Sequence, residues 1–190
     1  MISNIFSTYI YVNKCNFNLD VFKKHILDTR KKNKEGRKVS NQGGWQSQLF
    51  FEPNKYNKEI FKTITKSVSE VMKILNFNKN LKLDGYWYNI NKKCSFNKPH
   101  AHAGNNTVIS GVLYIKTPKN CGNIIFNRND PLSSLLYDLN VNDYNEYTSS
   151  NYTIVPKEKR FVLFPASLKH YVEPNLSNQE RISISFNYVF

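Results

Sequence analysis

The sequence predicts a mainly β fold of the α+β class: a double-stranded β-helix (jelly roll, cupin-like) with two helices of the N-terminal half packed on its outer sheet. Two segments before residue 80 have helical spacing of apolar residues. Many short β-branched and aromatic segments follow, separated by turns rich in Asn, Lys, Pro and Gly. Aromatic residues make up 14% of the chain, which favours sheet. Helices followed by a run of short strands are typical of this architecture.

The N-terminal half contains a first strand over residues 8–12 and two predicted helices. In 19–32 the apolar residues recur at helical spacing, with Asn18 or Asp20 near the start. Polar, glycine-containing chain over 33–44 predicts a loop, and 45–51 predicts a short strand. A single apolar stripe marks 57–75 as the clearest helix, and such a stripe is the face that packs on a sheet.

The C-terminal half is predicted to consist of strands. These cover residues 81–91, 108–116, 122–126, 152–155, 160–165, 170–173 and 181–189. The polar stretch 128–150 lacks clear periodicity, so it predicts a long connection such as a lid or binding loop. We expect one domain over 1–190, with a support region in 1–80 and a jelly-roll core in 81–190 that carries the functional site.

Several features argue for a cytoplasmic protein. No apolar run reaches the length of a membrane span, and the first residues lack the charged and apolar regions of a secretory signal. The three cysteines, Cys15, Cys94 and Cys121, are too few and too widely spaced for a disulfide framework or a zinc motif. We therefore expect the chain in a reducing cytoplasm, that of a bacterial host if a phage encodes it.

The net charge of +13 raises the question of nucleic-acid binding. Lysines far outnumber arginines and are scattered, and Asn, Ile and Tyr are also abundant, a composition typical of an AT-rich genome. The interpretation we favour is a solvated basic face, with a nucleic-acid surface as the weaker alternative.

Histidines give the strongest functional signal. The chain contains four, and three of them are His100, His102 and His170. Two residues at i and i+2 on a strand point to the same face, so His100 and His102 could grip one metal ion. A third imidazole from a distant strand would complete a facial set with open positions, as iron oxygenases require.

The last predicted strand contributes a positively charged side chain, that of Arg181. Its alternation places Arg181, Ser183 and Ser185 on one face. An arginine that points into a barrel interior needs an anion there, because an unpaired buried guanidinium is costly. A planar carboxylate bound in bidentate fashion is the natural partner.

Four ordered blocks carry a family resemblance. They are Asn-x-Pro-His-x-His (97–102), Ser-Gly-Val-x-Tyr-Ile (110–115), Phe-Pro-x-x-x-x-His-x-Val-x-Pro (164–174) and Arg-x-Ser-Ile-Ser-Phe-Asn (181–187). Together they resemble the Fe(II)/2-oxoglutarate-dependent oxygenases, most closely a small uncharacterised branch frequent in phages and marine bacteria. The resemblance covers roughly residues 84–190, with a weaker echo at 43–47.

This resemblance implies roles for the histidines. His100 would be the first iron ligand and His170 the distal one. Most members of the wider superfamily have Asp or Glu at the position of His102, so a third imidazole here gives an iron site with one more positive charge. The His-x-His form matches the small branch, in which we expect all three histidines to be metal ligands.

The resemblance also implies a cosubstrate site. Arg181 would pair with the far (C5) carboxylate of 2-oxoglutarate, and Tyr114 would hydrogen-bond the same group. Ser183 could add a hydroxyl contact. Tyr88 and Asn89, on the strand before His100, would face the cosubstrate or the substrate.

The implied activity is hydroxylation of an unidentified substrate with Fe(II) and 2-oxoglutarate, releasing succinate and CO₂. Two alternatives stay open. One is a three-histidine cupin-type dioxygenase that does not use 2-oxoglutarate, and the other is a non-catalytic jelly-roll binding or structural module. We expect a small-molecule or peptidyl substrate; oxidation of a nucleic-acid base is the weaker idea, and aromatic stacking residues would be needed for it.

Overall fold

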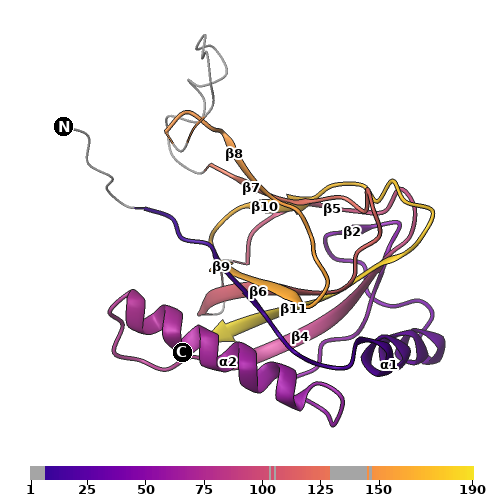
Figure 1. The fold of residues 1–190 in the computed structure, drawn as a ribbon, viewed down its shortest axis with the longest axis horizontal. Coiled ribbons are helices and arrows are strands. Elements are labelled where there is room, and N and C mark those ends of the chain that lie inside the picture. Colours follow the sequence, from indigo (N-terminus) through magenta and orange to yellow (C-terminus); the bar gives the residue numbers. More distant parts are fainter. Residues whose placement is uncertain (1–6, 103, 105, 129–144, 146) are drawn as a thin grey trace.

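Two antiparallel sheets face each other in the computed structural model, with both helices outside the larger sheet (Figure 1). The structure describes residues 7–102, 104, 106–128, 145 and 147–190. The helices are α1 (Leu19–Lys32) and α2 (Lys58–Ile74). The strands are β1 (Tyr11–Lys14), β2 (Asn41–Gln42), β3 (Trp45–Gln46), β4 (Lys82–Asn91), β5 (Phe96–His100), β6 (Thr107–Lys116), β7 (Ile124–Asn127), β8 (Asn151–Ile154), β9 (Arg160–Pro165), β10 (His170–Val172) and β11 (Arg181–Val189).

The strand order is that of a jelly roll. The larger sheet runs β1-β9-β6-β11-β4-β3 and the smaller one β2-β5-β10-β7-β8. From β4 onward the chain passes repeatedly between the two sheets, so neighbours in a sheet are distant in sequence. This confirms the predicted double-stranded β-helix with two helices on its outer face.

Most predicted elements are present within a few residues of their expected bounds. Two short strands were not predicted: β5, and β2 inside the expected 33–44 loop. Most of the predicted 128–150 connection lies outside the described residues. Within the described residues, no helix is long and apolar enough to cross a membrane.

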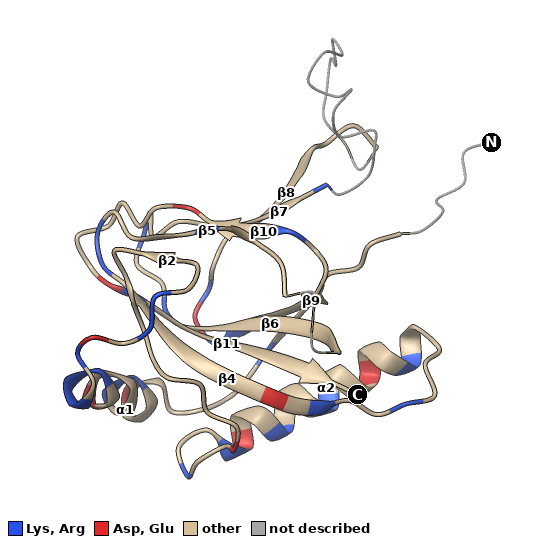
Figure 2. Cartoon of the chain, turned by 180° about the vertical axis from the view of Figure 1, so that it is seen from behind, with Lys and Arg blue, Asp and Glu red and all other residues tan. Residues whose placement is uncertain are grey.

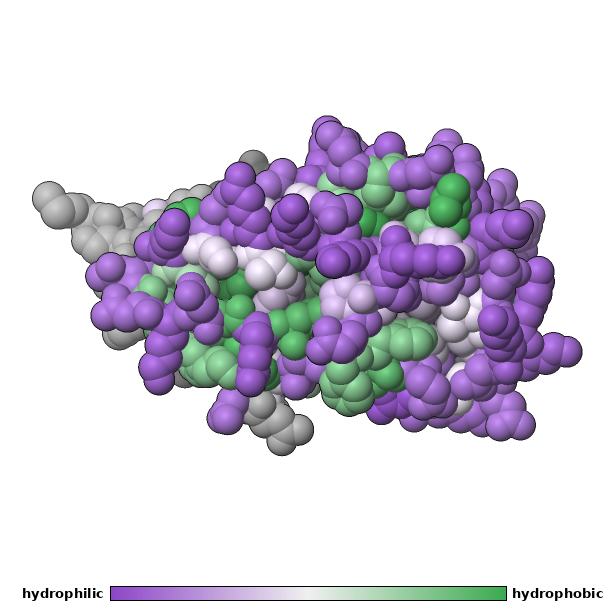
Figure 3. Space-filling view, turned by 90° about the horizontal axis from the view of Figure 1, so that it is seen from below, coloured by the Kyte–Doolittle hydropathy of each residue, from purple (hydrophilic) through white to green (hydrophobic). Residues whose placement is uncertain are grey.

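The helices cover the outer face of the larger sheet. Ile60, Ile64 and Val68 of α2 are buried in one cluster with Tyr86 and Ile184 of the sheet. At the start of α1, the Asn18 side chain accepts hydrogen bonds from backbone N–H groups of the first turn, which is the usual stabilisation of a helix N-terminus. Seen from below, the helix-bearing side is mainly hydrophilic with hydrophobic areas between (Figure 3), so the helices turn their polar faces to solvent.

The inner faces of the two sheets enclose a second, smaller cluster. Val112, Tyr114, Val162 and Phe164 of the larger sheet meet Phe126 of the smaller one there. Because side chains alternate along a strand, β6 sends Leu113 to the helix side and its neighbours Val112 and Tyr114 to the barrel interior. This alternation decides which residues can take part in a site between the sheets.

The helix–sheet cluster should provide much of the fold's stability. We predict that Ile64→Ala lowers the free energy of unfolding by about 2–5 kcal/mol, because Ile64 is fully buried and truncation leaves a cavity. Urea denaturation measures the change. The control is Ile74→Ala on the same helix: Ile74 is 76% exposed, so the effect should stay within about 0.5 kcal/mol. Equal effects of the two substitutions would contradict this packing.

Candidate metal centre

Three histidines lie close together between the sheets: two at the end of β5 and just after it, and one at the start of β10. His170 at the start of β10 stands directly opposite His100 at the end of β5 in the strand register. The nitrogen atoms that His100, His102 and His170 can offer to a metal all lie within 4.8 Å of one another. Their ring centroids are 4.5–5.3 Å apart. This spacing suits one ion bound by three imidazoles, and the structure brings together the three histidines that the sequence predicts as ligands.

Backbone carbonyls orient two of the rings. His100 Nδ1 lies 2.7 Å from the Lys98 carbonyl oxygen, and His170 Nδ1 lies 2.9 Å from that of Leu168. When Nδ1–H donates to a carbonyl, Nε2 is left as the lone-pair nitrogen that can bind a metal. The two strands thereby fix both the direction and the tautomer of these imidazoles.

His102 reaches the site in a different way from the prediction. β5 ends at His100, so His102 lies just after the strand and not on it. Its backbone N–H donates to the Ala166 carbonyl at 2.8 Å, which ties this turn to the connection that leads into β10. Its ring stacks at 22° to that of His170. His102 is therefore positioned by a backbone hydrogen bond, whereas the prediction relied on strand alternation.

Burial keeps the imidazoles neutral. It lowers the pKa of His102 to about 3 and that of His170 to about 4, with smaller contributions from the neighbouring histidines. The pKa of His100 is also lowered, again mainly by burial. At neutral pH all three rings are therefore unprotonated and able to donate a lone pair to a metal ion.

Arg181 lies buried at the start of β11, 3% exposed. Its Nη1 donates to the carbonyl oxygens of Cys121 and Gly122, at 2.8 and 3.2 Å. Within the described part of the chain no carboxylate lies at ion-pair distance from it. A buried guanidinium held by carbonyls alone is a ready site for an anionic ligand.

Tyr114 and Ser183 lie beside Arg181 on the inner face of the larger sheet. Ser183 stands opposite Tyr114 of β6 and Asn89 of β4 in the register. Burial raises the pKa of the Tyr114 phenol, and the positive charge of Arg181 opposes that shift. The phenol is thus neutral and able to donate a hydrogen bond in the region of Arg181.

Asn89 and Tyr88 point to opposite faces of β4. The Asn89 side-chain nitrogen donates to Ser185 Oγ at 3.0 Å, on the inner face, and its amide oxygen is buried without a partner. Tyr88 is fully buried among the helices, where its ring contacts Phe22 and His25. The prediction that Tyr88 faces the cosubstrate or substrate is therefore wrong, because adjacent strand residues project to opposite sides of the sheet.

Two aromatic residues that project to the inner faces of the sheets were missed in the sequence. Trp87 lies two residues before Asn89 on β4, and its ring centroid is 5.9 Å from that of His102. Tyr152 of β8 is paired with Phe126, which is paired with His170. Strand alternation could have placed Trp87 beside Asn89, whereas Tyr152 depends on pairings between distant strands.

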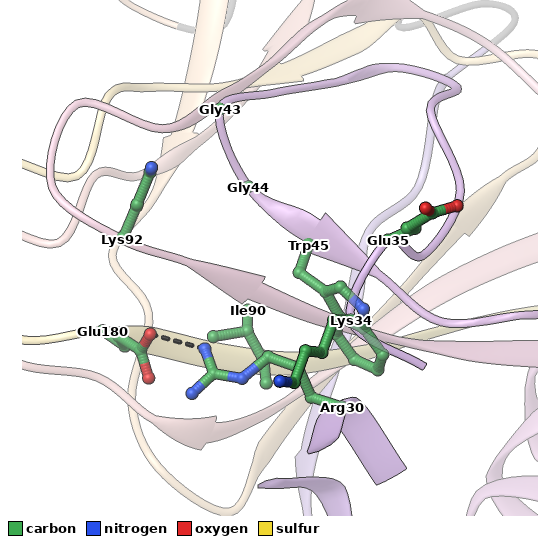
Figure 4. Close-up of a pocket in the computed structure, with 9 residues that line it drawn as sticks. All are labelled: Arg30, Lys34, Glu35, Gly43, Gly44, Trp45, Ile90, Lys92 and Glu180. Atoms are coloured by element: carbon green, nitrogen blue, oxygen red, sulfur yellow. Dashed lines mark hydrogen bonds and ion pairs between the residues drawn. The ribbon is translucent and has the colours of Figure 1, made fainter. Parts of the chain in front are cut away.

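Two surface pockets lie outside this site. One has a volume of about 230 Å³ and is bordered by the α1 end, the Gly43–Gly44 turn and β4 (Figure 4). Its most prominent contact is the ion pair between Arg30 and Glu180, at 2.6 Å. The other, of about 520 Å³, lies near the β6–β7 connection, where it includes Cys121 and Gly122. Neither pocket is lined by a histidine, so we assign the metal chemistry to the barrel interior.

The three-histidine arrangement predicts a strict dependence of metal binding on His170. His170→Ala should weaken Fe(II) binding by more than about 100-fold, beyond the loss typical for residues that only orient a ligand. Anaerobic equilibrium dialysis measures the affinity. His25→Ala is the matched control, because His25 lies between Tyr56 and Phe22 on the helix side. Unchanged affinity in the His170 variant would place the metal elsewhere.

Comparison with solved structures shows the same fold in oxygenases. A viral collagen prolyl hydroxylase from Paramecium bursaria chlorella virus-1, in its 2-oxoglutarate complex, is 15% identical with a TM-score of 0.59, over 95% of both chains. A Trichoplax adhaerens prolyl hydroxylase is 12% identical with a TM-score of 0.62, covering 95% of this chain and 83% of that one. HygX from Streptomyces hygroscopicus, with nickel, 2-oxoglutarate and hygromycin B bound, is 11% identical with a TM-score of 0.58, covering 96% and 83%.

Sequence comparison identifies the family. None of the curated proteins matches the chain. The family model described as "Putative 2OG-Fe(II) oxygenase" matches residues 85–187, a span that contains the three histidines and Arg181 and exceeds half of the chain. The protein therefore belongs to the family of 2-oxoglutarate- and Fe(II)-dependent oxygenases.

Proposed function

We propose that this oxygenase hydroxylates its substrate with Fe(II) bound by His100, His102 and His170 and with 2-oxoglutarate bound at Arg181. The observation that carries the proposal is the arrangement of donors in one barrel interior. Three neutral imidazoles converge at one end, and the buried guanidinium of Arg181, which pairs with no carboxylate among the described residues, lies on the same inner surface. The imidazoles would bind Fe(II), and the guanidinium would bind a carboxylate of 2-oxoglutarate.

The residues present fit both groups. Three nitrogen donors within 4.8 Å leave open positions on a six-coordinate ion, as needed for a chelating cosubstrate and O₂. Arg181 supplies the positive charge and the planar donors that a carboxylate prefers. Bound Fe(II) and 2-oxoglutarate supply the oxidising chemistry, in which R–H, O₂ and 2-oxoglutarate give R–OH, succinate and CO₂.

The protein's own part is to bind, orient and exclude water. The carbonyls of Lys98 and Leu168 hold two imidazoles with their Nε2 atoms available to the metal. Arg181 offsets the negative charge of the cosubstrate, and the Tyr114 hydroxyl can donate to the same carboxylate. The apolar residues around Phe126 and Phe164 line the barrel interior and exclude water, which limits side reactions.

A dioxygenase without 2-oxoglutarate is the second candidate, because all three metal donors are imidazoles. Arg181 argues against it, since that mechanism needs no buried guanidinium in the barrel interior, and no carboxylate of the described residues pairs with this one. Succinate formed in step with substrate oxidation identifies the first function, and oxidation without succinate identifies the second.

We also propose that the enzyme works in a reducing compartment such as the cytoplasm. All three cysteines are free thiols, with Cys15 and Cys121 buried and Cys94 exposed. This supports the expectation from the spacing of these residues.

Removal of the guanidinium should separate cosubstrate binding from metal binding. We predict that Arg181→Gln weakens 2-oxoglutarate binding by about 30-fold or more, since loss of one partner of a buried charge pair costs about 2–5 kcal/mol. Fe(II) affinity should not change. Two calorimetric titrations under nitrogen measure the affinities: Fe(II) into the metal-free protein, and 2-oxoglutarate into the Fe(II) protein. Arg30→Gln is the control, because Arg30 pairs with Glu180 outside the barrel interior. Equal cosubstrate affinity in wild type and Arg181→Gln would refute the role of Arg181.

The proposed function is tested by anaerobic titration of the Fe(II) protein with 2-oxoglutarate, followed by visible absorption. Chelation of the cosubstrate by Fe(II) gives a weak visible band, which we expect in the wild type and, at saturating cosubstrate, in Arg181→Gln. The band should be absent in His170→Ala. Iron binding without the band would favour the dioxygenase that does not use 2-oxoglutarate, and the absence of iron binding would refute both enzymatic functions.

A further inference from the structure

One buried glutamine in the segment 43–47 has no structural partner. Its neighbours shape the edge of the larger sheet: Gly43 forms the turn with a φ of +71°, and the Trp45 indole N–H donates to a backbone carbonyl after α1. Ser47 Oγ accepts a hydrogen bond from a backbone N–H of β4. Gln46 is 4% exposed, yet its side-chain amide makes no hydrogen bond to the residues that the structure describes. A buried amide without a partner is costly, so this position predicts a ligand.

Gln46 projects into the barrel interior next to a second amide. In the pairing of β3 with β4, Gln46 stands opposite Asn89. The adjacent pair, Trp45 and Ile90, belongs to the cluster under the helices, so alternation sends Gln46 to the inner face. Asn89 lies on the same face, where its side-chain nitrogen is 3.0 Å from Ser185 Oγ. Two primary amides therefore stand side by side on neighbouring strands, with Cβ atoms about 5 Å apart.

The Asn89 amide also has an unused hydrogen-bonding group. Its Oδ1 is buried without a partner among the described residues, while Nδ2 donates to Ser185 Oγ. The serine hydroxyl can equally donate, and a half-turn of the amide exchanges its oxygen and nitrogen in nearly the same space. Ser185 then donates to Oδ1, and the NH₂ group takes the place of the unpartnered atom. In this arrangement Gln46 and Asn89 both present N–H donors to the interior.

These amides lie between the metal end of the barrel and Arg181. On β4, Trp87 is two residues from Asn89 on the metal side, and its ring centroid is 5.9 Å from that of His102. Asn91 is two residues away on the other side, where it is paired with Arg181. Each step of two residues along a strand spans about 7 Å. A diacid that extends from the metal to Arg181 therefore passes Asn89.

The proposed cosubstrate needs donors at this place. 2-Oxoglutarate has only hydrogen-bond acceptors, and Arg181 and Tyr114 serve its C5 carboxylate. The C1 carboxylate chelates the metal through one oxygen, so its other oxygen requires N–H donors in a water-poor interior. Along β4 the charged positions are confined to its start, at Lys82 and Asp84, which are both exposed (Figure 2). No carboxylate of this strand therefore competes for the two amides.

From these observations we propose that Gln46 and Asn89 donate hydrogen bonds to the C1 carboxylate of 2-oxoglutarate. The cosubstrate is then held at both ends, by Arg181 at C5 and by the two amides at C1, so that its keto acid faces the metal. Gln46 thereby becomes a binding residue contributed by the edge strand β3. The inference rests on the proposed function, because it takes the Fe(II) site as the place where the cosubstrate binds.

The test is anaerobic titration of the Fe(II) protein with 2-oxoglutarate, followed by the visible band of the chelate. Gln46→Met keeps the length of the side chain and removes its donors. We expect the affinity for 2-oxoglutarate to fall about 10- to 150-fold, the range for one hydrogen bond to a charged group. Fe(II) affinity should not change. The thermal midpoint of unfolding should also stay the same, because the Gln46 amide bonds no described part of the protein.

The matched control is Gln42→Met on β2. Gln42 lies next to Asn41, which is in the same cross-strand row as Val172. Val172 packs against the interior cluster, so Gln42 projects to the outer face of the smaller sheet. Its replacement should leave the affinity for 2-oxoglutarate unchanged.

The second amide tests the same contact independently. In Asn89→Asp the carboxylate still accepts from Ser185, but it cannot donate and it repels the C1 carboxylate. The affinity for 2-oxoglutarate should therefore fall by more than about 100-fold.

The position of the visible band distinguishes contact with the C1 carboxylate from a general effect on the site. The absorption moves charge from Fe(II) to the keto acid, and a hydrogen bond to the keto acid lowers the energy of the accepting orbital. At saturating cosubstrate, Gln46→Met should therefore shift the band to shorter wavelength. Arg181→Gln should leave its position unchanged, because the C5 carboxylate is not part of the absorbing group.

The outcomes separate this inference from the proposed function. If the band forms but Gln46→Met binds 2-oxoglutarate as tightly as the wild type, the amides do not hold the cosubstrate. A weaker affinity with an unmoved band, or equal losses in Gln46→Met and Gln42→Met, would mean an indirect effect. Each of these results refutes the inference while the proposed function stands. If the band does not form in the wild type, the proposed function fails and the inference fails with it.

Discussion

The metal site depends on the antiparallel pairing of β5 with β10. In this register His100 and His170 stand directly opposite each other, with Phe126 of β7 on the far side of His170. Paired residues in antiparallel strands have Cβ atoms about 5 Å apart, which is the separation that two imidazoles need to share an ion. A shift of one residue would turn either ring to the other face of the sheet and remove the site.

The larger sheet provides the complementary wall. Its inner face presents a polar series along β11, with Arg181, Ser183 and Ser185, next to Asn89 and Trp87 of β4. Its outer face is apolar and carries the helices, so stability and chemistry are assigned to opposite sides of the same strands. The helices can therefore stabilise the sheet without occupying the space between the two layers, which is left for metal, cosubstrate and substrate.

The sequence was sufficient to predict most residues of the site, but not the strand pairings and hydrogen bonds that position them. The four sequence blocks predicted the three histidines, and the alternation along the last strand predicted that Arg181, Ser183 and Ser185 share one face. The assignment of both Tyr88 and Asn89 to the site failed because only one of two adjacent strand residues can face inward.

Other features depended on information that a single sequence does not contain. β5 has a polar, proline-containing sequence without clear alternation, and its partners β2 and β10 are distant in the chain. His102 is placed by a backbone hydrogen bond to Ala166, which no residue pattern reveals. Tyr152 joins the row of His170 through two successive strand pairings. These relations arise from tertiary pairing, which the local pattern leaves open.

The most direct test of the three-imidazole iron site is X-ray absorption spectroscopy of the anaerobic Fe(II) protein and of its His102→Ala variant. The account predicts outer-shell scattering from three imidazoles in the wild type and from two in the variant. A wild-type spectrum with two imidazoles, unchanged by the substitution, would contradict it and would mean that His102 does not bind the metal.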